Sequence, residues 1–336
     1  NNMNKKTTST LLALLLMLGL QLSAQQKQLA IDDLMNRKLF PSSLNNLQWR
    51  SNTLFTWNAG SSIFQNNVKT ATVDTLLSLD QLNLIAEKAQ QKKLRNLPML
   101  KWENENIFRY TNDSKIFHFN MLTRELSMVN SYETDAENID MEPATGRIAF
   151  TRENNLYVSE NGKTMAVTSD TDKGIVNGKT VHRNEFGIDG GTFWSPKGNL
   201  LAFYRMDETM VTQYPLLDIN QRIAQVEYIR YPMAGMASHH VTVGVYNPLT
   251  KQVVFLKTGE PAEQYLTNVS WSPDEKYIFI AVLNRDQNHM WLNKYDAVTG
   301  AFVKTLFEET DNEYVEPLHG PEFLKTNPSQ FIWQSR

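Results

Sequence analysis

The sequence predicts an all-β protein, a β-propeller of four-stranded blades of which about five and a half are present. Three observations predict this fold. Residues 193–203 hold a Pro-x-Gly turn between two apolar, aromatic-rich runs, which is the pattern of a tight hairpin. The same layout returns over 269–280, and a weaker copy spans 141–150. One short-stranded unit repeated at irregular intervals of about 50 to 80 residues is typical of propeller blades.

The composition excludes several classes of protein. Of the 336 residues, 41% are hydrophobic and 10% aromatic, so the chain can bury several sheet interfaces and is too apolar to be disordered. A net charge of -3, with both signs interspersed, gives no basic surface for nucleic acid. The sequence has no cysteine, which leaves no disulfide and no thiol chemistry, and we expect no cofactor.

Residues 1–24 have the pattern of a secretory signal peptide. A lysine pair precedes an apolar run over 11–20, and small residues stand at 23 and 24, where cleavage is expected. The run is shorter than the roughly 20 residues that span a bilayer, so we expect no membrane span after cleavage. A retained anchor is the alternative. An exported protein without disulfides fits the bacterial periplasm or cell surface.

The elements before the first repeated turn follow from local patterns. Residues 31–39 are typical of a short helix that ends before Pro41. Residues 47–50 and 54–57 are expected to pair as the first two strands. A capping box and apolar residues at helical spacing predict a surface helix over 78–93, between two blades.

The later strands show alternating apolar and polar residues. Blade two is expected at 102–119 and blade three at 139–158. Blade five is expected at 269–300, and a sixth unit is expected to begin at 323–334. A propeller that does not close leaves unpaired sheet edges, which invite aggregation. We therefore expect 25–336 to be the N-terminal part of a propeller that is incomplete at its C-terminus.

The segment 205–240 interrupts this rhythm, because it inserts more than about 30 residues between two strands of one blade. Two Tyr-Pro pairs and an alternating apolar pattern favour an extended arm that contacts a second subunit. The alternative is an excursion that folds back onto its own domain.

Known catalytic motifs are missing from the sequence. A hydrolase nucleophile elbow needs Gly-x-Ser-x-Gly, but the two glycine pairs with that spacing enclose Val176 and Asp189. No phosphate-binding, dinucleotide-binding or His-Glu-x-x-His motif is present. The adjacent His239 and His240 cannot point to the same side of a strand, so we expect no metal site.

Glu185 is the candidate binding residue. It lies between a stretch of turn-forming residues and Gly187, on a loop or short helical turn that leads into the strand at Trp194. A carboxylate in that position could hold a cationic group of a ligand. The alternative is a solvated carboxylate, or one paired with Arg183. The acidic pair Asp207 and Glu208 is a rival candidate. It stands at a strand end and is expected to be structural or exposed.

Three segments together resemble a known family: VHRNEFGIDGGTFWSPKG (181–198), YPMAGMASHHVTVGVYNP (231–248) and YLTNVSWSPDEKYIFIAVL (265–283). They are similar to the N-terminal propeller domain of bacterial dipeptidyl peptidase IV, in the prolyl oligopeptidase family of serine peptidases. The resemblance implies an eight-bladed propeller that caps an α/β-hydrolase domain with a Ser-Asp-His triad. That domain is absent from this chain, so no catalytic residue is named.

The resemblance also implies roles for particular residues. In the family, two glutamates on a short helical turn of the propeller hold the free amino group of the substrate. Here the motif falls at Asn184 and Glu185, so Glu185 matches the second glutamate and Asn184 departs from the first, which would weaken amine binding. A family arginine near the substrate carbonyl is matched to Arg109. The arm at 205–240 corresponds to a blade extension that helps to form homodimers.

The function implied is that of a substrate-gating propeller domain that recognises peptide N-termini. The whole enzyme would be an exported exopeptidase that removes dipeptides with proline or alanine second. The alternative is a non-enzymatic periplasmic propeller that binds a partner protein, as TolB-like propellers do. A Gly-x-Ser-x-Gly motif beyond residue 336 would favour the enzyme.

Overall fold

The computed structural model describes residues 29–36, 39–40 and 43–335. The chain divides into two compact units, residues 1–45 and 46–336. In the first unit, α2 (Ile31–Met35) is a short helix with two aspartates in its first turn. It begins where the sequence predicts a helix but ends at Met35 rather than at residue 39. The predicted signal peptide over 1–24 and Pro41 lie outside the described residues.

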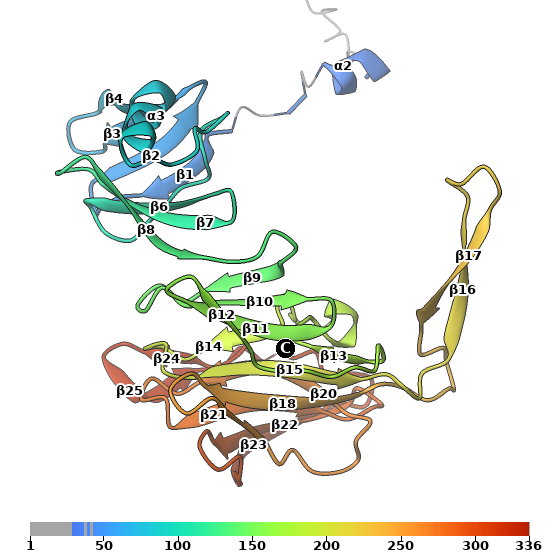
Figure 1. Cartoon of the computed structure of the whole chain (residues 1–336). Coiled ribbons are helices and arrows are strands. Elements are labelled where there is room, and N and C mark those ends of the chain that lie inside the picture. The colour runs from blue at the N-terminus through green and yellow to red at the C-terminus, as the bar shows by residue number, and fades with distance from the viewer. Residues whose placement is uncertain (1–28, 37–38, 41–42, 336) are drawn as a thin grey trace, which may run out of the picture. The chain divides into compact units, whose positions relative to one another are not determined.

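Antiparallel sheets that follow one another along the chain make up the second unit (Figure 1). The first sheet contains β1 (Asn45–Trp49), β2 (Leu54–Ala59), β3 (Ser62–Asn67) and β4 (Thr72–Ser78). The second contains β5 (Lys101–Trp102), β6 (Ile107–Asn112), β7 (Lys115–Asn120) and β8 (Glu125–Ser131). The third contains β9 (Glu137–Met141), β10 (Ile148–Arg152), β11 (Asn155–Glu160) and β12 (Lys163–Ala166).

The fourth sheet has five strands: β13 (Ile175–Asn177), β14 (Thr192–Trp194), β15 (Leu201–Asp207), β18 (His240–Asn247) and β19 (Gln252–Phe255). The fifth contains β20 (Tyr265–Trp271), β21 (Tyr277–Leu283), β22 (His289–Asp296) and β23 (Phe302–Thr310). A sixth sheet has two strands, β24 (Glu322–Leu324) and β25 (Asn327–Ile332). The expected blades are confirmed, with the third extending to Ala166.

Each sheet shares a hydrophobic core with the next one along the chain. The central strands therefore bury both faces: Leu201 and Phe203 of β15 pack toward the third sheet, and Ala202 and Tyr204 pack toward the fifth. Strands buried on both faces have continuous apolar sequences, as the segment 277–283 also shows. Four-stranded antiparallel sheets stacked face to face confirm the predicted propeller. Among the described residues no sheet closes on itself.

The repeated turns join paired strands, as predicted: β14 with β15, β20 with β21, and β9 with β10. In the first two turns a serine hydroxyl closes the hairpin. The Ser195 hydroxyl accepts a hydrogen bond from the Leu200 N–H at 2.9 Å, and the Ser272 hydroxyl accepts one from the Tyr277 N–H at 3.0 Å. The third turn has Glu142 at that position, and its carboxylate accepts from the N–H of Ala144 and Thr145.

The predicted helix is α3 (Leu79–Lys88), which ends earlier than residue 93. Its capping box is confirmed, because the Ser78 hydroxyl accepts from the Gln81 N–H and the Gln81 side chain accepts from the Ser78 N–H. Leu82 is buried in the core between the first and second sheets, and Ala86 is also buried, so the helix seals that interface as well as covering the surface.

The segment 205–240 contains a separate two-stranded sheet, β16 (Gln213–Asp218) and β17 (Gln225–Arg230), inserted between β15 and β18 (Figure 1). Nearly all its residues are exposed, and within the part of the chain that the structure describes its two strands pair only with each other. The predicted extended arm is therefore present.

Among the described helices, none is long and apolar enough to cross a membrane.

Candidate functional site

The turn that carries Asn184 and Glu185 has an unusual backbone. A short helical turn, η1 (His182–Asn184), has left-handed φ angles of 50°, 55° and 62° at its three residues. Glu185 returns to an extended conformation. Left-handed backbone costs about 1–2 kcal/mol for each residue with a side chain, so this turn needs support from its surroundings.

The main support is the buried side chain of His182. Its Nε2 accepts a hydrogen bond from the Leu266 N–H at 3.1 Å, and its Nδ1 lies 3.0 Å from Nε2 of His239. Because Nε2 is an acceptor, the proton of the neutral ring is on Nδ1 and is donated to His239. Burial, and then the charges of His239 and Arg285, hold the pKa of His182 well below its usual value, so the ring stays neutral.

A second support comes from the two residues after Glu185. Phe186 is buried, with its ring edge against Tyr265 at a centroid distance of 5.0 Å, in a core that also contains Val315. Gly187 has a φ of +73°, and a Cβ atom there would lie 2.1 Å from the Leu318 carbonyl oxygen. Only glycine fits this contact, so the segment around Leu318 closes tightly against the turn.

Between these supports, the Glu185 side chain is exposed. Its backbone is fixed, since the Glu185 N–H donates to the His182 carbonyl and the Glu185 carbonyl accepts from the Ile188 N–H, both at 3.1 Å. Across residues 43–335, no hydrogen bond or ion pair engages its carboxylate. Arg183 is not its partner, because that guanidinium lies over the Tyr231 ring at 4.0 Å. The site thus presents a free carboxylate beside the exposed amide of Asn184.

Asp207 and Glu208 have mainly structural contacts, as expected. The Asp207 carboxylate accepts from the backbone and hydroxyl of Thr209 at 2.9 and 2.7 Å. Glu208 is half-buried, which raises the pKa of its carboxyl, while Arg230 and Arg183 oppose that rise. The backbone carbonyl of Glu208 accepts from Arg230, which links this strand end to the base of the arm.

Arg109 lies on β6, in a different setting from the turn. Its Nε is 2.6 Å from a carboxylate oxygen of Glu103, and both side chains are largely buried. His118 is its cross-strand neighbour, and burial lowers the pKa of that imidazole. In the described part of the chain, no hydrogen bond or ion pair joins Arg109 to Asn184 or Glu185. The structure therefore brings Asn184 and Glu185 together and places Arg109 in an ion pair of its own.

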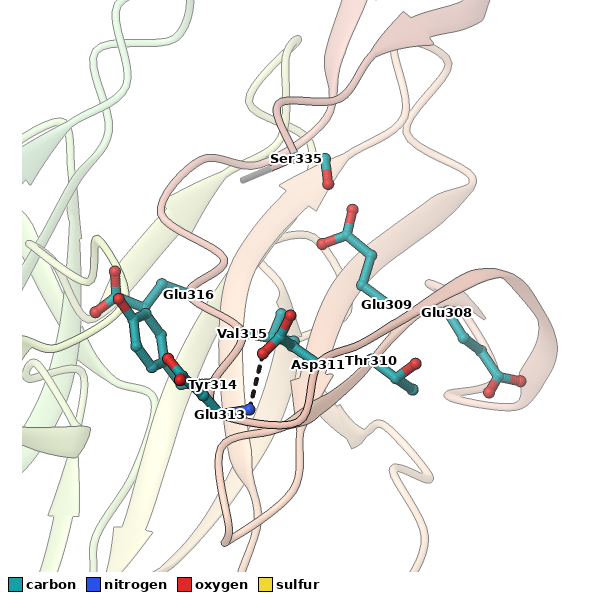
Figure 2. A pocket seen from close by; sticks show the side chains of 9 residues that line it. All are labelled: Glu308, Glu309, Thr310, Asp311, Glu313, Tyr314, Val315, Glu316 and Ser335. Atoms are coloured by element: carbon teal, nitrogen blue, oxygen red, sulfur yellow. Dashed lines mark hydrogen bonds between the residues drawn. The ribbon is translucent and has the colours of Figure 1, made fainter.

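An acidic cleft of about 590 Å³ lies along the segment that packs against the turn. Figure 2 shows carboxylates at the end of β23 and on the loop that follows it, and the lining residues are Glu308, Glu309, Thr310, Asp311, Glu313, Tyr314, Val315, Glu316 and Ser335. Val315 belongs to both the cleft and the core beneath the turn. The cleft favours cations near the site. Nowhere in the described residues are three metal-ligating side chains grouped to hold a metal ion.

Comparisons with known proteins agree with this architecture. The family model described as the dipeptidyl peptidase IV (DPP IV) N-terminal region matches residues 94–336. The dipeptidyl-aminopeptidase B of Aspergillus niger is 24% identical over 259 residues, which are 70% of this chain and 29% of that protein. The chain therefore spans less than a third of the length of this relative.

Two crystal structures are similar. One, described as a dipeptidyl aminopeptidase IV from Bacteroides ovatus, superposes with a TM-score of 0.81 and 43% identity, covering 88% of this chain and 41% of that chain. Dipeptidyl peptidase 4 of Porphyromonas gingivalis shares the fold. It superposes with a TM-score of 0.70 and 18% identity, covering 92% of this chain and 46% of that chain. Since the family model matches well over half of its residues, the chain belongs to the dipeptidyl peptidase IV N-terminal region family.

Proposed function

We propose that this chain is the substrate-gating domain of a dipeptidyl aminopeptidase, and that Glu185 binds the ammonium group at the N-terminus of a peptide. The observation that carries the proposal is a free, exposed carboxylate on a turn whose backbone is fixed on both sides. Preorganised charge of this kind loses little entropy when it binds a ligand. The peptidase names of the relatives and the adjacent acidic cleft support the same reading.

The strength of amine recognition then depends mainly on one residue. A carboxylate and an ammonium about 4 Å apart, at an effective dielectric near 20, attract by roughly 4 kcal/mol before desolvation is subtracted. Asn184 adds a neutral acceptor in place of a second carboxylate. A peptide whose amino group is acetylated has no charge for Glu185 to bind, so the site favours removal of residues from free N-termini.

The remaining parts of the proposal concern the whole protein. The reaction is proton-assisted acyl transfer by a serine triad on an α/β-hydrolase domain, on peptides with proline or alanine second. Arg109, with its guanidinium fixed by Glu103, is the proposed donor to the substrate carbonyl. The protein is exported through its 1–24 signal peptide, and the arm within 205–240 joins two subunits.

The test compares Glu185→Ala and Glu185→Gln in the full-length enzyme with chromogenic Gly-Pro substrates, free or N-acetylated. We expect the KM for the free substrate to rise about tenfold or more, because a full charge pair is lost. The ratio of kcat/KM between free and acetylated substrates should fall toward one. Asp189→Asn, which changes an exposed carboxylate four positions further on, is the control. An unchanged ratio in both Glu185 variants would remove Glu185 from the site.

A further inference from the structure

Two buried imidazoles connect the turn to distant parts of the chain. His182 is 3% exposed and His239 is 8% exposed, and their ring centroids are 5.0 Å apart. The hydrogen bonds run from the Leu266 N–H on β20 to His182, and from His182 to His239, which precedes β18. Three segments separated by tens of residues thus meet at one side chain.

Because of the position of His182 within the turn, its hydrogen bonds hold the backbone of the turn in place. His182 is the first of the three left-handed residues, so fixing its side chain fixes the backbone where the change of handedness begins. The turn itself contributes few bonds, chiefly those from the Asn184 N–H to Val181 and from the Glu185 N–H to His182. Without the hydrogen bonds from Leu266 to His182 and from His182 to His239, the strained residues could relax toward right-handed backbone. The Glu185 carboxylate would then move with them.

The hydrogen bonds of the pair have a fixed direction. Leu266 donates to His182, and His182 donates to His239, so His239 acts only as an acceptor at Nε2. The charged groups around His239 are Arg285, Arg183 and His240, with Glu263 opposing them. Ser238 donates its N–H to Glu263 at 3.0 Å, which holds this carboxylate beside the pair.

We propose that His182 and His239 are positioning residues, which hold the left-handed turn so that Glu185 presents its carboxylate to the substrate ammonium. This inference rests on the proposed function of Glu185. The directed network makes it specific, because only a side chain that accepts a hydrogen bond at the Nε2 position can replace His239. Glutamine places its amide oxygen there, whereas leucine fills similar space and leaves the buried Nδ1–H of His182 without an acceptor.

The experiment uses the full-length enzyme with His239→Leu, His239→Gln and the same two changes in a Glu185→Ala background. His239→Leu should raise the KM for a free Gly-Pro substrate by about five- to tenfold, which is the range expected when a buried donor loses its acceptor. The kcat/KM for the N-acetylated substrate should stay within about twofold of the parent. His239→Gln should restore the parent KM.

The double variants separate this inference from the proposed function. In the Glu185→Ala background, His239→Leu should have little further effect, because the group that it positions is gone. Equal losses on free and acetylated substrates, or the same loss with and without Glu185, would overturn the inference. If Glu185→Ala alone leaves the KM unchanged, the proposed function itself fails.

A second variant covers the case in which His239→Leu does not fold. His182→Met keeps a weak sulfur acceptor for the Leu266 N–H and has no hydrogen to donate to His239. We expect it to raise the KM for the free substrate and to leave the acetylated substrate unaffected. A parent-like KM in folded His182→Met would overturn the positioning role.

Discussion

Asn184 illustrates how conformation and charge compete at a single residue. Its φ of 62° is left-handed, and asparagine tolerates that region better than most side chains. A glutamate at this position would add a second carboxylate but would make the turn more strained. The asparagine therefore stabilises the turn, while it weakens the negative charge that the proposed amine site can offer.

Asn184→Glu in the full-length protein tests how this residue affects both the turn and the proposed amine site. We expect the KM for free Gly-Pro substrates to fall by up to about tenfold, because a second carboxylate would face the ammonium. The melting temperature should drop slightly, by an amount that matches less than about 1 kcal/mol. Steady-state kinetics and a thermal unfolding scan check both changes. A KM that stays the same while the protein remains folded would show that position 184 does not contact the amine.

The His239 ring predicts a pH dependence of stability. Burial, followed by the charges of Arg285, Arg183 and His240, lowers the pKa of His239 to about 4, from the usual 6.5. The unfolded chain therefore binds a proton at this residue before the folded chain does. The stabilising contribution is complete above about pH 6.5 and is lost as the pH falls toward 4, at about 1.4 kcal/mol for each pKa unit.

The check is urea unfolding at several pH values between 7.5 and 4, for the parent and for His239→Gln. Carboxylates elsewhere affect both proteins alike, so the difference between the two isolates the histidine. The parent should lose more stability than the variant over this range. Identical slopes for the two proteins would contradict the prediction.

At this scale the sequence could predict the Glu185 turn but not its supports. Glu185 stands among turn-forming residues, which is a local signal. His182 and His239 are 57 positions apart, and Leu266 is 84 positions from His182, so their contacts depend on how the fourth and fifth sheets pack. The adjacent histidines at 239 and 240 are the one local hint to these contacts, because side chains alternate across a strand and one of the two rings must point inward. The tight contact of Gly187 with Leu318 is equally non-local.

At the scale of elements, the repeated Trp-Ser-Pro turn has two tasks. The serine closes its own hairpin, and the tryptophan reaches back to the preceding sheet. The Trp271 indole donates to the Phe193 carbonyl at 2.9 Å, and the Trp194 indole donates to the Asp140 carbonyl at 3.3 Å. The Glu275 carboxylate adds contacts to Lys197 and Asn199 in the neighbouring turn. In the fourth and fifth sheets the motif therefore both turns the chain and attaches the sheet to the preceding one.

Trp271→Phe separates these two tasks. Phenylalanine keeps most of the buried ring but leaves the Phe193 carbonyl without its indole donor, so we expect a loss of about 1–3 kcal/mol in the free energy of unfolding. Trp49→Phe is a matched control, because Trp49 is 63% exposed and its indole makes no hydrogen bond in the described part of the chain. Urea titration of both variants provides the measurement. Equal losses would mean that the indole donor contributes nothing.

Local signals also explain which elements were predictable. The capping box at Ser78 located α3, but after its end at Lys88 the chain turns back to the helix, where the Asn83 side chain bonds the backbone N–H and carbonyl of Leu94. Strands in the first and second sheets were predicted from local strand and turn patterns, since those sheets carry no copy of the repeated turn. The third blade continues through β12, which is a short, half-exposed strand without an apolar pattern.

At the scale of the whole molecule, each sheet shares its core with its neighbours in sequence, as in a repeat protein. The arm is the exception, because it leaves this series. Cross-strand pairs put apolar side chains on both of its faces: Leu217 opposite Val226 on one, and Tyr214 opposite Ile229 on the other. Arg230 anchors its base, donating to the carbonyls of Glu208, Thr209 and Val211.

This combination of a fixed base and two exposed apolar faces is what a subunit contact requires. We expect the full-length protein to be a dimer, and Leu217→Glu combined with Ile223→Glu to shift it to monomers. Those side chains are 62% and 81% exposed, so the changes should leave each subunit folded. Leu249→Glu, at a hairpin turn and 79% exposed, is the control that adds a charge away from the arm. Sedimentation velocity at micromolar concentration distinguishes the states. Dimers that persist in the arm variant would place the interface elsewhere, and dissociation of the control would show that added charge alone separates the subunits.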